Sequence, residues 1–495
     1  MKKIFNFLLI FFLTIQCSFD NKTGIWTEDG PVKIVDKKES ESKDISKLKK
    51  NKKFKISCAF IRSKEKYKEC LTGEKRELAD AVYEEVFAER ETFNAEINPG
   101  QNYIVSLEKP SDNTEWAQKY LNFNNNISNI SYNNKKQKIF KSKKLSNFKD
   151  DFDLDYRSPH DILIYNNQLV SYDHNGSIYI YSPNIKKKTF TFNFYKKKYK
   201  KNKKKLYLVI KDNKLYVSDS LGFMYSLDLN NGKLLWAQNF GIPFRSNIKI
   251  IDNQLLLANQ DNIIYSVDRS NGETNWRFAT TLTFLKSFFT NSLLVDKKND
   301  SIIFLNTSGE LYSINYINQK INWVLNFMSS GINEPKLFFS LPLTQKENNL
   351  IISTGNTIVN FDPRYGAKKW STPISTNVKY VLTKKNIFLV TSNNLLVCLD
   401  ISSGEIIWSK NVYKEVLKIK KKLKKEKMGF ITNLNIADNE IILFSSKGYI
   451  LSFNHKIGAI KNISKFGNKG LGSNPLYANG YMYLFNKNNK ILIYE

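Results

Sequence analysis

Very few residues in this sequence have the types and spacing that catalysis or metal binding requires. The cysteines and histidines are Cys17, Cys58, Cys70, Cys398, His160, His174 and His455. No pair of cysteines has the C-x-x-C spacing of a zinc or redox site, and the histidines form no motif. No nucleophile–base pair or metal-ligand set can be assembled from these side chains. We therefore predict that the protein is not an enzyme and has no catalytic residues, no cofactor and no metal.

Carboxylates do recur along the chain, but at a regular phase that indicates a structural role. The recurring polar residues are Asp228, Asp268, Asn315, Asp362, Asp400 and Asn454. Each one opens a short polar turn, and Asp and Asn side chains commonly cap the backbone of such turns. Because one cap is needed in every repeated unit, the recurrence predicts turn capping.

These polar turns belong to a sequence unit that is repeated from near residue 160 to the end of the chain. Its clearest copy, residues 214–236, is typical of two short strands, each followed by a turn, and the start of a third strand. A Gly-x-x-x-Trp element closes four copies, and a fifth has Gln in place of Gly. The five tryptophans are Trp236, Trp276, Trp323, Trp370 and Trp408. We expect them to be buried between neighbouring units.

The spacing of the repeat predicts the fold class. Two degenerate copies with Phe190 and Asn462 complete seven positions, which lie 38 to 54 residues apart. A period near 40–45 residues with about four short strands per unit is typical of propeller blades. An eighth blade would join residues 491–495 to a strand from residues 113–128, around Trp116, which would remove the exposed edges. The prediction is an all-β, eight-bladed β-propeller with four-stranded antiparallel blades.

The N-terminus has the pattern of an export signal. Lys2 and Lys3 precede an apolar run over residues 4–15 that is short for a membrane span. Residues 13–17 (LTIQC) resemble a lipobox, in which the cysteine is lipidated, although Gln16 departs from the usual small residue. An ordinary signal peptide is the alternative. Ser18 after the cysteine permits transfer to the outer membrane.

Four regions follow from these observations. Residues 1–16 are predicted as the signal peptide, and residues 17–73 as a polar, flexible tether anchored by lipid on Cys17. Residues 74–98 are predicted as an amphipathic helix that precedes the propeller, because apolar residues recur there at helical spacing. Residues 99–495 form the propeller. A disulfide between Cys58 and Cys70 is feasible in an oxidising compartment but is not decided by the sequence.

The formal charge of +30 raises the question of nucleic-acid binding. Lysines occur throughout, in strands and turns alike, and arginine is scarce, so the charge lacks the concentration expected of a nucleic-acid site. No nucleic-acid partner is predicted. Two lysine-rich stretches, residues 196–205 and 414–427, are either solvated insertions or contacts with anionic lipid headgroups, and the second has the spacing of a short amphipathic helix.

The pattern Gly-x-x-Tyr-Ser-Leu-Asp-x-x-x-Gly-x-x-x-Trp resembles the PQQ-type propeller repeat. Quinoprotein dehydrogenases and the BamB family of outer-membrane assembly lipoproteins share this repeat, and the resemblance covers about residues 100–495. The dehydrogenases need a quinone pocket, a calcium site and usually two adjacent cysteines, and this sequence has no adjacent cysteines. The signal, lipobox, tether and repeats are more similar to the BamB family.

That resemblance implies a non-catalytic scaffold of the outer-membrane β-barrel assembly machinery, lipid-anchored at the periplasmic face of the outer membrane. The implied partners are the barrel-inserting subunit, other assembly lipoproteins and substrates, bound by a monomeric propeller within a complex. A PQQ-dependent quinoprotein dehydrogenase and a periplasmic binding propeller of other purpose are the alternatives.

The resemblance also implies a partner-binding stretch after the third blade that has a recognisable copy of the repeat. In the BamB family a Leu-x-Leu-Arg element follows that Trp position, and residues 281–286 (TLTFLK) follow Trp276 here. Leu282, with Phe284 or Leu285, would fill the apolar places and Lys286 the basic one, although Lys lacks the planar fork of Arg. The alternative is that residues 282–285 are simply the inner strand of the next blade.

Lipid anchoring through Cys17 is directly testable. Cys17→Ala should release the protein into the soluble periplasmic fraction, because the acyl chains would be its only stable hold on the membrane. Fractionation with mass spectrometry of the mature N-terminus measures this. An unmodified N-terminus at another residue would contradict the lipobox interpretation.

Overall fold

The computed structural model describes residues 18–20, 25–27, 93–100, 105–145, 161–195, 199, 202–282, 291–327, 340–354 and 357–495. The chain divides into two compact units, Met1–Ala79 and Asp80–Glu495. Within the first unit, β1 (Ser18–Asp20) and β2 (Ile25–Thr27) pair as an antiparallel hairpin inside the predicted tether.

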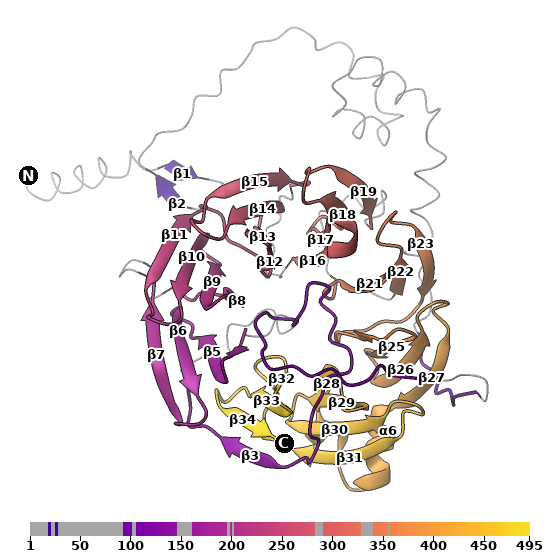
Figure 1. The fold of residues 1–495 in the computed structure, drawn as a ribbon. Helices are drawn as coiled ribbons and strands as arrows, with labels where there is room; N and C mark the ends of the chain where they lie inside the picture. The colour runs from indigo at the N-terminus through magenta and orange to yellow at the C-terminus, as the bar shows by residue number, and fades with distance from the viewer. Residues whose placement is uncertain are drawn as a thin grey trace, which may run out of the picture. The chain divides into compact units, whose positions relative to one another are not determined.

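The second unit contains a ring of eight four-stranded antiparallel sheets in the part that the structure describes (Figure 1), which confirms the predicted eight-bladed propeller. Blades I to IV consist of β4 (Leu163–Tyr165), β5 (Gln168–Tyr172), β6 (Ser177–Ser182) and β7 (Lys187–Asn193); β8 (Leu206–Lys211), β9 (Lys214–Asp219), β10 (Phe223–Asp228) and β11 (Leu234–Asn239); β12 (Lys249–Ile251), β13 (Gln254–Ala258), β14 (Ile263–Asp268) and β15 (Thr274–Ala279); and β16 (Ser292–Asp296), β17 (Ser301–Leu305), β18 (Glu310–Asn315) and β19 (Ile321–Asn326).

Blades V to VIII consist of β20 (Thr344–Lys346), β21 (Asn349–Thr354), β22 (Thr357–Phe361) and β23 (Lys368–Thr372); β24 (Val381–Leu382), β25 (Asn386–Val390), β26 (Leu395–Asp400) and β27 (Ile406–Asn411); β28 (Ile431–Ala437), β29 (Glu440–Ser445), β30 (Tyr449–Asn454) and β31 (Ile460–Lys465); and β32 (Leu476–Ala478), β33 (Tyr481–Phe485), β34 (Ile491–Tyr494) and β3 (Lys138–Lys141). A 3₁₀ turn, η2 (Lys297–Asn299), joins β16 to β17.

Burial explains why the two middle strands of each blade are almost continuously apolar. They pack against the neighbouring blades on both faces, so β9, β14 and β26 are buried along most of their length. The outer strands have one solvated face and alternate, as in β15 (TNWRFA). The hydrophobic effect therefore acts mainly between blades.

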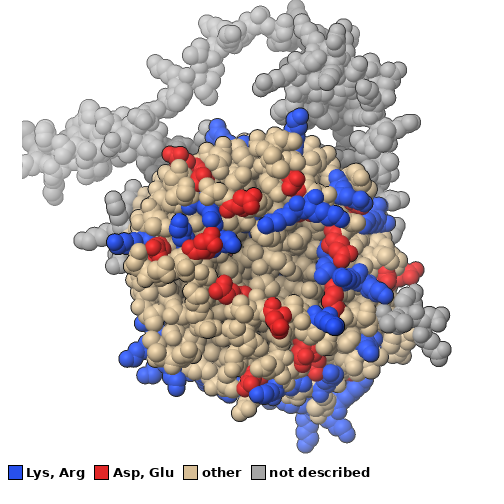
Figure 2. All heavy atoms as spheres, viewed as in Figure 1, with Lys and Arg blue, Asp and Glu red and all other residues tan. Residues whose placement is uncertain are grey.

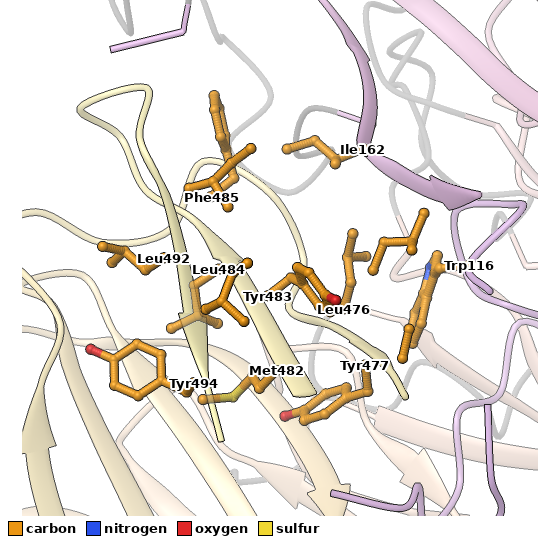
Figure 3. Close-up of a cluster of buried hydrophobic side chains, with 14 of the residues drawn as sticks. Trp116, Ile162, Leu476, Tyr477, Met482, Tyr483, Leu484, Phe485, Leu492 and Tyr494 are labelled. Carbon is orange, nitrogen blue, oxygen red and sulfur yellow. The ribbon is translucent and has the colours of Figure 1, made fainter. Parts of the chain in front are cut away.

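Blade VIII closes the ring with strands from both ends of the propeller. β3 pairs with β34, the last strand of the chain, and a buried cluster that includes Tyr477, Met482 and Tyr494 surrounds this junction (Figure 3). The split closing blade is as predicted, but the predicted position of its N-terminal strand was wrong. The strand is β3 and does not lie within residues 113–128, whose backbone turns through left-handed conformations at Leu121 (φ 64°) and Asn125 (φ 54°).

Residues 111–131 form a loop inside the ring, which we call the inner loop (Figure 1). It contacts the innermost strand of each blade in circular order: β32 through Asn113, β4 through Trp116, β8 through Ala117, β12 through Asn122, β16 through Phe123, β20 through Asn124, β24 through Asn126 and β28 through Ile130. The loop then closes on itself, because Ser111 and Ser131 each donate a backbone N–H, to the carbonyls of Asn129 and Ser111 respectively.

The five repeat tryptophans occupy equivalent positions on the outer strands. Each pairs across the blade just before a β-bulge, as in Cys398–Trp408 and Ser226–Trp236. Phe190 and Asn462 take the same place in blades I and VII. Trp236, Trp370 and Trp408 are buried, whereas Trp276 and Trp323 are only half-buried.

Each buried tryptophan docks against the turn of the following blade. The indole N–H of Trp370 donates to the carbonyl of Ile401 at 2.9 Å, and that of Trp236 donates to Arg269 at 2.9 Å. The ring of Trp370 covers Gly404, where an added β-carbon would lie 2.5 Å from Cε3. Gly404 also has φ 76°, so glycine is required there by both space and conformation. In blade IV the corresponding residue is Gln319, at φ 59°.

The recurring Asp and Asn residues cap these turns, as the sequence predicts. Their side-chain Oδ1 atoms accept the backbone N–H two residues on, at 2.8 Å from Asn230 to Asp228 and 2.8 Å from Ser402 to Asp400. Asp268, Asn315, Asp362 and Asn454 make the same contact.

Two predicted helices have different outcomes. Residues 93–98, the described end of the helix predicted over 74–98, are not helical but extended, because Ile97 pairs with Ser409 on the outer edge of β27. The helix predicted within 414–427 is present as α6 (Val412–Ile419), followed by α7 (Lys425–Met428). Val412 and Val416 are buried in a cluster with residues of blades VI and VII, so α6 is part of the core.

The tryptophan docking predicts a graded loss of stability. Trp370→Ala and Trp408→Ala should each lower the free energy of unfolding by about 3–5 kcal/mol, because a large buried side chain is removed. Trp276→Ala should cost clearly less, since that ring is half-buried and faces Gln319 in place of glycine. Denaturant unfolding measures all three. Equal losses at the three positions would contradict the docking interpretation.

Candidate functional site

The two faces of the ring are built from different loops. The face viewed in Figures 1 and 2 carries the turns that join the first two strands of each blade and the turns that the repeat Asp and Asn residues cap. The inner loop lies on this side of the channel, where Asn129 Oδ1 accepts the backbone N–H of Asn439. Acidic and basic side chains are interspersed over this face (Figure 2). The opposite face carries the connections between blades.

A pocket opens on the opposite face, in the central channel, and is lined by residues of blades V, VI, VII and VIII. Its volume is about 330 Å³, which is within the range of small-molecule sites. Tyr120 and Ile127 of the inner loop line its inner end. Its walls come from the segments that precede β20, β24, β28 and β32, including Leu341, Val378 and Leu471.

Positive charge is buried around this channel. Lys249 on β12 is 1% exposed, and its Nζ donates to the carbonyl of Asn122 at 2.8 Å and to Oδ1 of Asn125 at 2.7 Å. Burial, together with the positive charge of Lys379, lowers the pKa of Lys249 to about 7. Lys379 lines the pocket, and burial lowers its pKa to about 7 as well.

A third buried lysine is neutralised. Nζ of Lys119, in the inner loop, lies 3.1 Å from Oδ1 of Asp161, and both side chains are almost fully buried. No such ion pair forms for Lys249 or Lys379 with any carboxylate that the structure describes. Neither Lys249 nor Lys379 was predicted from the sequence as a site residue. The pattern that could have indicated Lys249 is a single lysine within an otherwise apolar strand, IKII at 248–251.

The predicted partner-binding stretch is described only at its start. Leu282 is 62% exposed, three residues after the end of β15, on the connection to blade IV. Two turns contact the residues just before it: Asn262 Nδ2 donates to the backbone carbonyl of Thr281 at 3.1 Å, and Asn306 Nδ2 donates to the side-chain Oγ1 of Thr280 at 3.1 Å. Phe284, Leu285 and Lys286 lie outside the described residues. The inner strand of blade IV is β16, which begins at Ser292.

The described pocket does not fit the quinone and calcium of the dehydrogenases. Calcium requires several oxygen ligands, commonly carboxylates. The described residues of the pocket wall include no Asp or Glu, and no group of three or more His, Cys, Asp or Glu residues in the described part of the chain could hold a metal ion. These residues supply cations and amides instead.

The predicted membrane anchor is outside the structural description. Cys17, the signal at 1–16, Cys58 and Cys70 all belong to residues that are not described, and Cys398 is a buried free thiol on β26. Within the described residues no helix is long and apolar enough to cross a bilayer.

The first lysine-rich stretch contains one lysine that is not solvated. Among the described residues of 196–205, Lys204 is 4% exposed, and its Nζ donates to the carbonyls of Asn202 at 2.7 Å and Asn175 at 3.2 Å. Its Nζ also lies 4.4 Å from the ring centre of Tyr195. Lys204 therefore anchors this stretch to blade I.

Comparisons with known proteins place this architecture among PQQ-type propellers. The family model described as outer membrane protein assembly factor BamB matches residues 196–410 and 354–461, which together span more than half of the chain. No curated protein gives a significant sequence match.

Solved structures with this fold include BamB and dehydrogenases. BamB from Moraxella catarrhalis has a TM-score of 0.55 at 14% identity, covering 72% of this chain and 98% of its own. A europium-containing methanol dehydrogenase has 0.53 at 11%, covering 75% and 89%. The quinohemoprotein alcohol dehydrogenase from Comamonas testosteroni has 0.54 at 8%, covering 75% and 77%. At these identities the similarity establishes the fold alone.

The buried Lys249 predicts an unusual pH dependence of stability. The pKa of Lys249 falls from 10.5 to about 7 on folding, so between these values the unfolded chain binds a proton that the folded chain has lost. The free energy of unfolding should therefore rise as pH increases through this window. Thermal unfolding measured across this pH range should show that stability increases less with pH in Lys249→Met than in the wild type.

Lys385→Met is the matched control, because Lys385 is exposed on the turn between β24 and β25. It should keep the wild-type dependence. Identical pH profiles for Lys249→Met and the wild type would show that Lys249 keeps its ordinary pKa.

Proposed function

This chain belongs to the family of the outer membrane protein assembly factor BamB, and from that premise we propose that it is a non-catalytic scaffold of outer-membrane β-barrel assembly. It acts at the periplasmic face of the outer membrane, anchored by lipid on Cys17. It binds the barrel-inserting subunit, other assembly lipoproteins or substrates. Family membership carries this proposal, because fold similarity alone extends equally to enzymes.

A rigid ring with variable surface loops suits such a role. The eight blades fix the core, so a loop on either face can present a binding group without disturbing the packing. Leu282 is such a group: an exposed apolar side chain that directly follows Thr280 and Thr281, which accept hydrogen bonds from side chains of two blades. Little conformational entropy would be lost when a partner covers it.

The proposal is tested by pull-down of the barrel-inserting subunit from detergent-solubilised membranes. The wild-type chain should retain this subunit, and Leu282→Asp should weaken the binding by about tenfold or more, as expected for an apolar anchor at an interface. Leu235→Asp is the control, since Leu235 is comparably exposed on β11, an outer strand away from this connection.

Retention of the subunit by the control but not by Leu282→Asp would support both the partner and the contact. Absence of the subunit from the wild-type pull-down, with normal outer-membrane protein levels in a deletion strain, would refute the assembly role.

A quinoprotein dehydrogenase is the second candidate, because enzymes of that class have nearly the same structural similarity to this chain. The described residues of the pocket wall, which include no Asp or Glu, argue against it. Reconstitution with the quinone and calcium decides between them: stoichiometric binding and dye-linked alcohol oxidation would favour the enzyme.

A further inference from the structure

The described wall of the pocket carries positively charged side chains and no negatively charged one. Lys379 and Lys487 are the only Lys, Arg, Asp or Glu residues among those described in its wall. Asn, Ser and Thr side chains supply the remaining polar groups, such as Asn433, whose Nδ2 donates to Oδ1 of Asn474 at 3.1 Å. The electrostatic character of the pocket is therefore that of an anion site.

Lys379 is the lysine best placed to meet a ligand. It lies just before β24, and its Nζ is 5.3 Å from the ring centre of Tyr120 on the inner loop. Its hydrogen bond to the carbonyl of Tyr380 is long at 3.5 Å. An ammonium group has three donors, so Lys379 retains capacity for a strong acceptor.

The second buried ammonium, Lys249, increases the demand for an anion. Its charge and that of Lys379 repel each other. Lys249 is almost fully buried, Lys379 is half-buried on the pocket wall, and neither has a carboxylate partner among the described residues. Burying unpaired charge is costly, and proteins retain such groups mainly where a ligand or a reaction uses them. A bound carboxylate would supply the missing negative charge.

The other residues of the pocket wall favour a ligand that has an apolar body and a hydrogen-bond donor. Leu341, Val378 and Leu471 give the pocket apolar sides. Asn435 is 6% exposed, and its Oδ1 is buried without a hydrogen-bond partner in the described part of the chain. A ligand N–H would satisfy this acceptor.

We propose that the pocket binds an N-acylated, apolar amino-acid carboxylate, with the carboxylate on Lys379 and the amide N–H on Asn435. Such a group occurs both in small N-acyl amino acids and at the C-terminus of a polypeptide. This binding is independent of the assembly role, because the pocket wall does not include Leu282.

Calorimetric titration of the full-length lipid-free chain, made by Cys17→Ala, tests the proposal. N-acetylleucine should bind, and its uncharged analogue N-acetylleucinamide should bind about tenfold more weakly or not at all. A hexapeptide that ends in leucine, with a free or an amidated C-terminus, distinguishes the two sources: tighter binding of the free-acid peptide than of N-acetylleucine identifies a polypeptide C-terminus.

Variants separate the pocket from the surface. Lys379→Met should bind N-acetylleucine at least tenfold more weakly than the wild type. Lys379→Arg should retain binding because it keeps the positive charge. Lys385→Met, on the other face, should bind as the wild type does. Circular dichroism checks that each variant is folded. The acid and amide comparison on the wild-type chain needs no variant, so it remains decisive if Lys379→Met does not fold.

No binding of any free acid in the millimolar range, or equal binding of acid and amide, would overturn the proposal. Unchanged binding in Lys379→Met would overturn the assignment of the site. The pull-down described above can succeed or fail irrespective of these outcomes.

Discussion

The stability of the ring depends on how the unpaired backbone edges of its innermost strands are hydrogen-bonded. A propeller turns the first strand of every blade toward a central channel, where each strand has an unpaired edge of backbone N–H and C=O groups. Here one segment of the chain reaches all eight strands, using its backbone at β4, β8, β12, β16, β20 and β28 and side chains at β24 and β32. The inner loop therefore couples blades that do not touch one another.

The outer side of the ring is coupled differently. There each contact joins only neighbours, through a tryptophan of one blade and the capped turn of the next. Such contacts form a chain, and a chain closes into a ring only if its two ends meet. Blade VIII provides this closure by pairing β3 with β34. Local docking and a closing strand together favour all-or-none assembly of the eight blades.

Sequence patterns predicted the repeated features well and the unique ones poorly. The turn caps at Asp228 and Asp400 recur in almost every blade, so their spacing revealed the fold. The inner loop occurs once, and its single Trp116 resembled the repeat tryptophans, which led to its assignment as a strand. Its actual contacts are long-range, as between Asn126 and Leu382, and no local pattern encodes them.

The candidate site was hidden for a related reason. Lys249 and Lys379 lie among many lysines, and only their position beside the channel distinguishes them from solvated ones. The half-buried state of Trp276 and Trp323 was also not predicted. Trp276 precedes the blade in which Gln319 replaces the turn glycine, whereas Trp323 still covers Gly366, so the loss of glycine does not explain both.

The asparagines of the inner loop show how one residue type satisfies several of these demands together. Asn125 adopts a left-handed conformation, donates Nδ2 to the carbonyls of Leu293 and Leu343 in two blades, and accepts from Nζ of Lys249. Aspartate would neutralise the lysine but could donate to neither carbonyl, and leucine would remove all three of these side-chain hydrogen bonds. Neutral acceptors thus hold the lysine in place while burial lowers its pKa. A carboxylate at this position would instead stabilise the protonated lysine and raise that pKa.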